Sequence, residues 1–170
     1  MNKTIRLITA SAVLVPALLV SQAALSQSAI VTPRSISFDA AQVLALEAVT
    51  KCRADGYRVT VAVVDRAGRT RVLMHDDGAS PHTGENAQRK AYTALTFRRP
   101  SVEMGKNFAA NPAGIGTMNL EKITGGEGGL PIRAGNEVVG GVGVSGAPGG
   151  EKDAVCAQAG IDRIAKGLAN

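Results

Sequence analysis

The chain has 170 residues, among them no tryptophan and only two tyrosines, three phenylalanines and two histidines. It also lacks any stretch of five or more consecutive lysines and arginines. Segments that bind nucleic acid combine clustered basic residues with aromatic ones, so these two absences argue against nucleic acid as a partner. The formal net charge of +5 includes Lys3 and Arg6 at the amino end, so the rest of the chain is only mildly basic.

No apolar run is long enough for a membrane span. The longest extends over residues 7–20, follows a short basic head and precedes the small residues Ala24 and Ser26. A span needs about 18–20 residues, whereas a secretory signal peptide needs fewer. We therefore expect a signal peptide at residues 1–26, a single domain at residues 27–170, and a periplasmic or secreted protein with no membrane span after cleavage. A membrane anchor that is not cleaved is the alternative.

Cysteine is scarce, and the two present, Cys52 and Cys156, do not form a CxxC pair. In an exported protein the two could form a disulfide bond. They could equally be two buried thiols, because cysteine packs well as a small apolar residue. The sequence favours the bridge slightly and leaves both open.

Motifs of the common enzyme classes are missing or incomplete. No GxSxG sequence is present, and the glycines at residues 125–129 lack the lysine and hydroxyl residue of a phosphate-binding loop. A GxGxxG pattern does occur from Gly141 to Gly146, but it lies within an expected strand, with too little chain after it for a dinucleotide-binding unit. The sequence thus predicts no catalytic residues and leaves enzymatic activity undecided.

Periodicity and turn residues predict an α+β fold with the order α-β-β-α-(loop)-β-β-α. Two hairpins without βαβ crossovers imply a single antiparallel sheet flanked by helices. The expected elements are a helix at Phe38–Asp55, strands at Arg58–Asp65 and Arg69–His75, a helix from Thr83 or Glu85 to Arg98, a loop with one short helix at Ser101–Met118, strands at Gly129–Ala134 and Glu137–Ser145, and a helix at Glu151–Leu168.

Two surfaces made of small residues stand out. On the second helix, one stripe contains Ala87, Ala91 and Ala94. On the last strand, strict alternation places Val138, Val142 and Val144 on one face. It leaves Val139, Gly141, Gly143 and Ser145 on the other, which is almost bare of side chains. Such surfaces permit close approach, either of another backbone or of a flat ligand.

His82 is the candidate metal ligand. It lies in a loop rich in glycine and proline, directly before the second helix, and a neutral imidazole is a good ligand for iron. His75, its rival, falls at the end of an expected strand, where we predict a solvated side chain. Arg89 and Lys90 are cations that could meet acidic groups of a ligand, and Tyr92 and Thr93 are further candidate binding residues.

Several segments, in order, resemble the GlcG/HbpS family of haem-binding proteins, also called the haem-degrading domain family. These are VTVAVVDRAG from Val59, DDGA from Asp76, RKAYTALTFRRP from Arg89, GGLPI from Gly128 and EVVGGVGVSGAPGGEKDAVCAQAGI from Glu137. The resemblance implies an antiparallel sheet with flanking helices, homo-oligomers that are often octamers, and binding of haem, with slow haem degradation or iron binding in some members. It implies no single axial ligand, since ligation differs among members.

Two hypotheses follow. The first is an exported haem-binding protein with a role in haem or iron scavenging, sensing or slow haem degradation. The second is a cofactor-free structural or accessory oligomeric protein, in which the small-residue surfaces simply pack helix on sheet.

Overall fold

A computed structural model describes residues 30–169, which include a folded unit that begins at Thr32. The expected signal peptide, residues 1–26, lies outside the described residues. Within the described range, none of the helices has the length and apolar character needed to cross a membrane.

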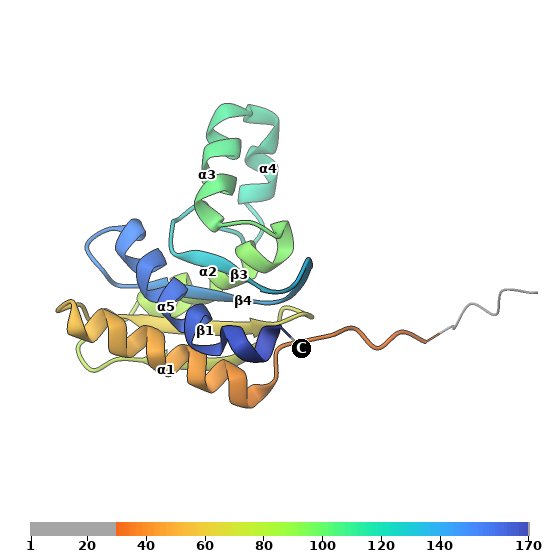
Figure 1. Ribbon diagram of the computed structural model, residues 1–170. Helices are drawn as coiled ribbons and strands as arrows, with labels where there is room; N and C mark the ends of the chain where they lie inside the picture. Colours follow the sequence, from red (N-terminus) through yellow and green to blue (C-terminus); the bar gives the residue numbers. More distant parts are fainter. Residues whose placement is uncertain (1–29, 170) are drawn as a thin grey trace, which may run out of the picture. The chain divides into compact units, whose positions relative to one another are not determined.

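The fold is α+β, as the sequence predicts (Figure 1). Four strands form one antiparallel sheet in the order β2-β1-β4-β3. The strands are β1 (Thr60–Asp65), β2 (Thr70–His75), β3 (Gly129–Ala134) and β4 (Glu137–Ser145). The helices are α1 (Phe38–Ala54), α2 (Thr83–Phe97), α3 (Ser101–Ala110), α4 (Ile115–Met118) and α5 (Gly150–Leu168), with a short 3₁₀ turn η1 (Pro112–Gly114) between α3 and α4.

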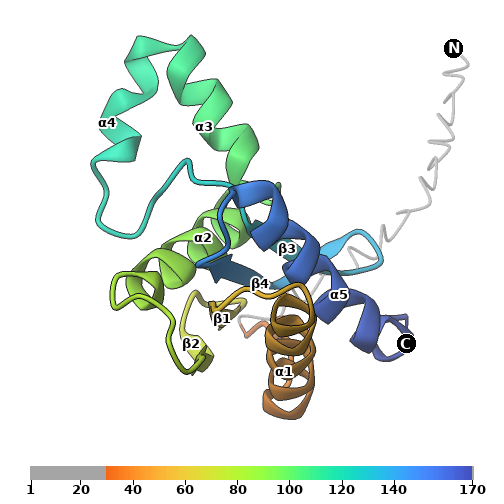
Figure 2. The ribbon, with the colours of Figure 1, turned by 90° about the vertical axis from the view of Figure 1, so that its left-hand side faces the viewer.

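Helices cover both faces of the sheet: α1 and α5 lie on one face and α2 on the other (Figure 2). The α1 and α5 side holds the larger core, in which Leu44 of α1 and Ile132, Val142 and Val144 of the sheet are fully buried. Ser37 begins α1 by accepting a hydrogen bond from the Ala40 backbone N–H, as expected of an N-cap.

A disulfide bond joins Cys52 of α1 to Cys156 of α5, and it decides the question that the sequence leaves open. Both cysteines are fully buried. Beside this link, Gly160 of α5 lies so close to α1 that a Cβ atom there would come within 2.6 Å of the Leu44 carbonyl oxygen. The disulfide and this close approach fix the two helices as one layer.

Helix α2 packs directly on the glycine face of β4. Ala87 and Ala91 of α2 are completely buried in this contact. A Cβ atom at Gly143 would lie 2.6 Å from the Ala91 backbone nitrogen, and one at Gly141 would lie 3.2 Å from Leu95 Cβ. The small-residue surfaces therefore serve contact between helix and sheet within one chain.

Two expectations are wrong. Strict alternation placed Val139 on the glycine face and Val138 with Val142 and Val144. Instead, Val139 belongs to the core under α1 and α5, and Val138 lines a hollow together with Tyr92 and Leu95 of α2. The cause is a shift in the pairing of β3 with β4 between Ile132 and Arg133, which interrupts the alternation. The segment expected to be mostly loop, residues 101–118, is largely helical. Its Gly105 does not break α3 but permits contact with the backbone of Gly125.

Candidate functional site

A cleft of about 340 Å³ lies where the N-terminal ends of α2 and α5 meet the carboxyl end of β4. The glycine-rich segment at residues 125–129 forms another wall. The lining of the cleft includes His82, Asn86 and Lys90 from the α2 side, Ser145 from β4 and Asp153 from α5. Asn86 Nδ2 donates to Ser145 Oγ over 2.9 Å, so α2 is also fixed to β4 by a polar contact at this end.

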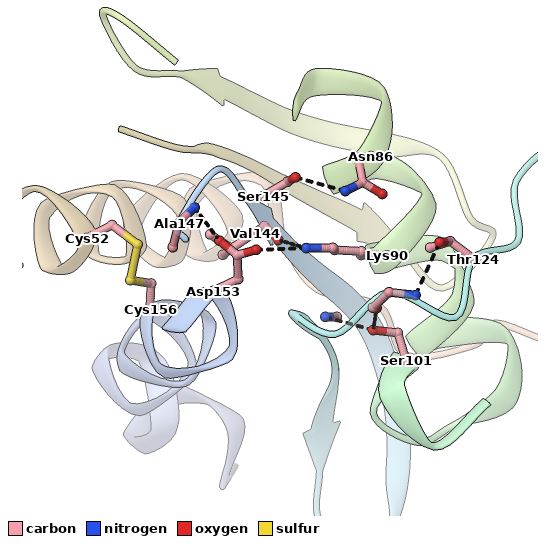
Figure 3. Close-up of polar contacts among 12 residues, drawn as sticks. Cys52, Asn86, Lys90, Ser101, Thr124, Val144, Ser145, Ala147, Asp153 and Cys156 are labelled. Atoms are coloured by element: carbon pink, nitrogen blue, oxygen red, sulfur yellow. Dashed lines mark hydrogen bonds and ion pairs between the residues drawn. A yellow bond between two sulfur atoms is a disulfide. The ribbon is translucent and has the colours of Figure 1, made fainter. Parts of the chain in front are cut away.

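The base of the cleft contains a buried ion pair. Lys90 Nζ lies 2.8 Å from Asp153 Oδ2 and donates a second hydrogen bond to the Val144 carbonyl oxygen over 2.9 Å (Figure 3). Only 5% and 4% of the two side chains are exposed. Burial raises the pKa of Asp153, and the opposing effects come from Lys90 and from the backbone N–H of Ala147, which donates to Asp153 Oδ1.

The ion pair connects α2 to α5 across the end of the sheet. Removing one partner would leave an uncompensated charge in a buried site, which is far more costly than losing a surface pair. Asp153 is therefore a structural partner of Lys90, and the amino group of Lys90 is already engaged in an ion pair.

The glycine-rich segment is attached to α2 and α3 by specific hydrogen bonds. Ser101 Oγ donates to the Gly126 carbonyl over 2.6 Å and accepts from the Gly129 backbone N–H over 2.9 Å. Thr93 Oγ1 accepts from the Thr124 backbone N–H over 3.0 Å. At Gly128, where φ is +117°, a Cβ atom would lie 2.7 Å from Asp153 Cβ, so glycine is required both by conformation and by space.

The five residues predicted to bind a ligand do not form one site. His82 and Lys90 line the cleft described above. Arg89 and Tyr92 line a separate cavity of about 120 Å³ beside Gly68 and Lys122, and Arg89 donates to the Ile123 carbonyl. Thr93 is fully buried beneath the glycine-rich segment. Helical geometry is the reason, because consecutive residues on α2 point about 100° apart.

His82 is exposed at the lip of the cleft. Within residues 30–169 its ring takes part in no hydrogen bond or ion pair, and no group of three histidine, cysteine or acidic side chains could hold a metal ion. A metal bound here would have to bring most of its own ligands.

His75 differs from the prediction of a merely solvated strand end. It is exposed, but its Nδ1 atom lies 2.6 Å from Oγ1 of Thr60, which is fully buried on the neighbouring strand. The two residues are directly paired across β1 and β2. Sequence reasoning missed this contact because it did not consider which residue lies opposite His75.

Sequence reasoning also missed Asp153. The signal that could have found it is its spacing, three and four residues before Cys156 and Ala157, which places an acidic residue on the buried side of α5. Ala154, one position further along, is only partly buried.

An apolar groove of about 510 Å³ lies between the start of α1 and the end of α5. Its walls include Ile36, Val43, Ile164 and Leu168. No histidine, tyrosine, cysteine or methionine lines it, so it offers no side chain of the kinds that usually hold haem iron.

Comparisons with known proteins agree on one family. Residues 36–162 match the family described as "Haem degrading protein HbpS-like". A 15.0 kDa protein from the dhaT-dhaS intergenic region of Citrobacter freundii is 30% identical over 130 residues, which make up 75% of this chain and 91% of that protein. The crystal structure of HbpS is 36% identical, with a TM-score of 0.75 and coverage of 80% of this chain and 94% of that one. The crystal structure of a PduOC:haem complex is 26% identical, with a TM-score of 0.69 and coverage of 76% and 95%.

Proposed function

The chain belongs to the HbpS-like family of haem-degrading proteins, and from this premise we propose that it binds haem. The observation in its own structure that supports the proposal is the position of its histidines. The chain has only two, His75 and His82, and both are exposed, on either side of the short segment at residues 76–81. Of the two, His82 lines the cleft. Neutral imidazole is a common ligand of haem iron.

The residues present fit haem in two respects. An accessible imidazole can bind an iron atom whose other ligands come from the porphyrin, which suits a chain without a cluster of metal-binding side chains in its described part. The volume of the cleft, about 340 Å³, falls within the range of small-molecule sites. When bound, haem would supply the redox chemistry of its iron, while the protein would supply the ligand and the surrounding charges.

The predicted role of Lys90 with the acidic groups of haem requires a change at the site. Lys90 is paired with Asp153, so a propionate would have to compete with a buried carboxylate. About one third of the Arg89 side chain is exposed to solvent, but this residue lines the other cavity. Haem bound at the cleft would thus be held mainly through iron ligation, because the lining of the cleft is largely polar.

The matching of alanine and glycine surfaces between α2 and β4 favours the second candidate function, a cofactor-free structural or accessory protein. These surfaces are fully used in packing, so neither is available to a flat ligand. Under this alternative the cleft would only be the junction of three elements.

Titration of the purified protein with haemin distinguishes the two candidates. Haem binding predicts a shifted Soret band with saturation at a fixed stoichiometry, whereas a cofactor-free protein leaves the spectrum of haemin unchanged. If His82 is the ligand, as the sequence predicts, His82→Ala will shift the Soret maximum and weaken binding tenfold or more, about 1.4 kcal/mol. Asn86→Ala changes the same cleft without removing an imidazole and serves as a control. An unshifted spectrum for His82→Ala would exclude His82 as the ligand.

Export and oligomerisation remain proposals of the same kind. A disulfide bond is typical of proteins in an oxidising compartment, which supports the expected signal peptide. N-terminal sequencing of the protein from the producing cell should find Gln27 first, and light scattering should report a homo-oligomer, with an octamer as the family resemblance implies. A product that retains Met1 would contradict export.

A further inference from the structure

A chain of buried hydroxyl groups leads from His75 to the start of α2. His75 Nδ1 lies 2.6 Å from Thr60 Oγ1, and Thr60 Oγ1 lies 2.7 Å from Thr83 Oγ1. Thr83 Oγ1 in turn lies 2.6 Å from the Ser80 carbonyl oxygen. Thr60 and Thr83 are 0% and 1% exposed, so water does not compete for these contacts.

The last contact fixes the direction of the others. A carbonyl oxygen only accepts, so the single hydroxyl proton of Thr83 is donated to Ser80. Thr83 must then accept from Thr60, which leaves Thr60 without a proton for the imidazole. Thr60 can therefore only accept from His75, and the donor is the Nδ1–H group.

The neutral ring of His75 is consequently held with its proton on Nδ1 and its lone pair on Nε2. This is the arrangement found in metal-binding histidines, whose second ring nitrogen donates to a protein oxygen that fixes the tautomer and the orientation of the ring. The ring of His82 has no such partner within residues 30–169.

His75 is exposed at the edge of the sheet, so its ring can be reached from solvent. It lies on the edge strand β2, on the face of the sheet that α2 covers, as its contact with Thr60 shows. Two residues earlier on the same face, Leu73 is 45% exposed, so an apolar side chain adjoins the imidazole there.

We infer that His75, through Nε2, is the imidazole that binds the haem iron, with Thr60 as its positioning residue. This inference rests on the proposed function in its choice of haem. A free ion fits less well, because the described residues offer no group of three ligands, whereas haem iron brings four nitrogen ligands and needs a side chain only at its axial positions.

The tautomer can be tested without haem. In ¹⁵N-labelled protein at a pH where the ring is neutral, long-range ¹H–¹⁵N spectra should show His75 protonated at Nδ1. Thr60→Val removes the acceptor while keeping a β-branched side chain, and should release the ring to the other tautomer. Thr60→Ser keeps the hydroxyl and should retain the Nδ1–H form. Protonation of His75 at Nε2 in the unmodified protein would overturn the inference.

Metal binding can be tested with Cu²⁺ alone as a probe of accessible imidazole lone pairs. Substoichiometric Cu²⁺ should broaden the signals of His75 before those of His82. Thr60→Val should weaken this binding about tenfold, as is typical for loss of a partner of a metal-binding histidine, and Thr60→Ser should not. Equal broadening of both rings, unaffected by Thr60→Val, would contradict the inference.

Haemin gives the decisive comparison, because the chain has only two histidines. His75→Ala should lose the imidazole-type spectrum and His82→Ala should retain it, whereas the opposite result would support the sequence prediction and overturn this inference. If unmodified protein fails to bind haemin, the proposed function fails, and the tautomer and Cu²⁺ measurements still decide whether His75 is a prepared ligand.

Discussion

Replacing Gly143 by alanine should force α2 away from the sheet. The added methyl group would lie 2.6 Å from the Ala91 backbone nitrogen and 3.0 Å from Lys90 Cβ, and closer still to the Ala87 carbonyl oxygen. Ordinary contacts of a Cβ atom begin near 3.4 Å. The helix must therefore move by roughly 1 Å, because a backbone atom cannot rotate out of the way as a flexible side chain can.

Overpacking of this kind costs about 1–3 kcal/mol in the free energy of unfolding. For a domain of this size, each kcal/mol lowers Tm by about 3–4 °C. Thermal unfolding followed by circular dichroism should thus show a decrease of roughly 3–12 °C for Gly143→Ala. Gly84→Ala is the matched control, since Gly84 lies in α2 with no atom within 4 Å of its added Cβ, and its Tm should stay the same or rise slightly. Equal Tm values for the two variants would refute the close packing of α2 on β4.

Three further predictions concern charges and the disulfide. Lys90→Met should lower the free energy of unfolding in urea by about 3–5 kcal/mol, and adding Asp153→Leu should recover most of the loss; a double variant as unstable as the single would contradict a buried pair. Arg53 donates a hydrogen bond to Asp76 and lowers the pKa of that carboxyl below its ordinary value near 3.8. The contribution of ionised Asp76 to stability is therefore present above pH 4 and lost on acidification. The stability difference between the unmodified protein and Asp76→Asn should therefore shrink from pH 5 to pH 3, and a constant difference would be inconsistent. Replacing Cys52 and Cys156 by alanine should cost about 2–5 kcal/mol, and a loss below 1 kcal/mol would show that the link contributes little.

Much of the fold could be predicted because local signals agreed with the tertiary structure. Gly135 adopts φ +61° in the turn between β3 and β4, and both strands have the predicted bounds. The errors have a related cause, since the place of Val139 follows a register shift between β3 and β4, and Gly105, which resembles a helix breaker, lies in α3 against the backbone of Gly125. Neither feature follows from the periodicity of its own segment, because each depends on how the segment meets another one.

The candidate site was less predictable for the same reason. The sequence grouped Arg89, Lys90 and Thr93 because they are neighbours along the chain, whereas the fold turns them to three different surroundings. The partner of Lys90 is Asp153, 63 residues later. The sequence prediction of His82 rested on its residue type and its place in a loop. The hydrogen bonds that orient His75 depend instead on the pairing of β1 with β2, which brings Thr60 opposite His75.

The two hydrogen bonds of Ser101 close the base of a long excursion of the chain. They join the start of α3 to Gly126 and Gly129, and Figures 1 and 2 show α3 and α4 extending outward from this base, away from the sheet. With its ends held together, the intervening segment resembles a closed loop, whose entropy depends only weakly on length, by about 0.6 kcal/mol for each doubling. Residues 113–121, none of which is buried, can therefore be shortened, lengthened or exchanged at small cost to the sheet, the buried ion pair and the cleft. Ile123 and Thr124 must be kept, because Arg89 and Thr93 of α2 bind their backbone. The exposed part is thus a natural position for grafting a tag or a second binding element.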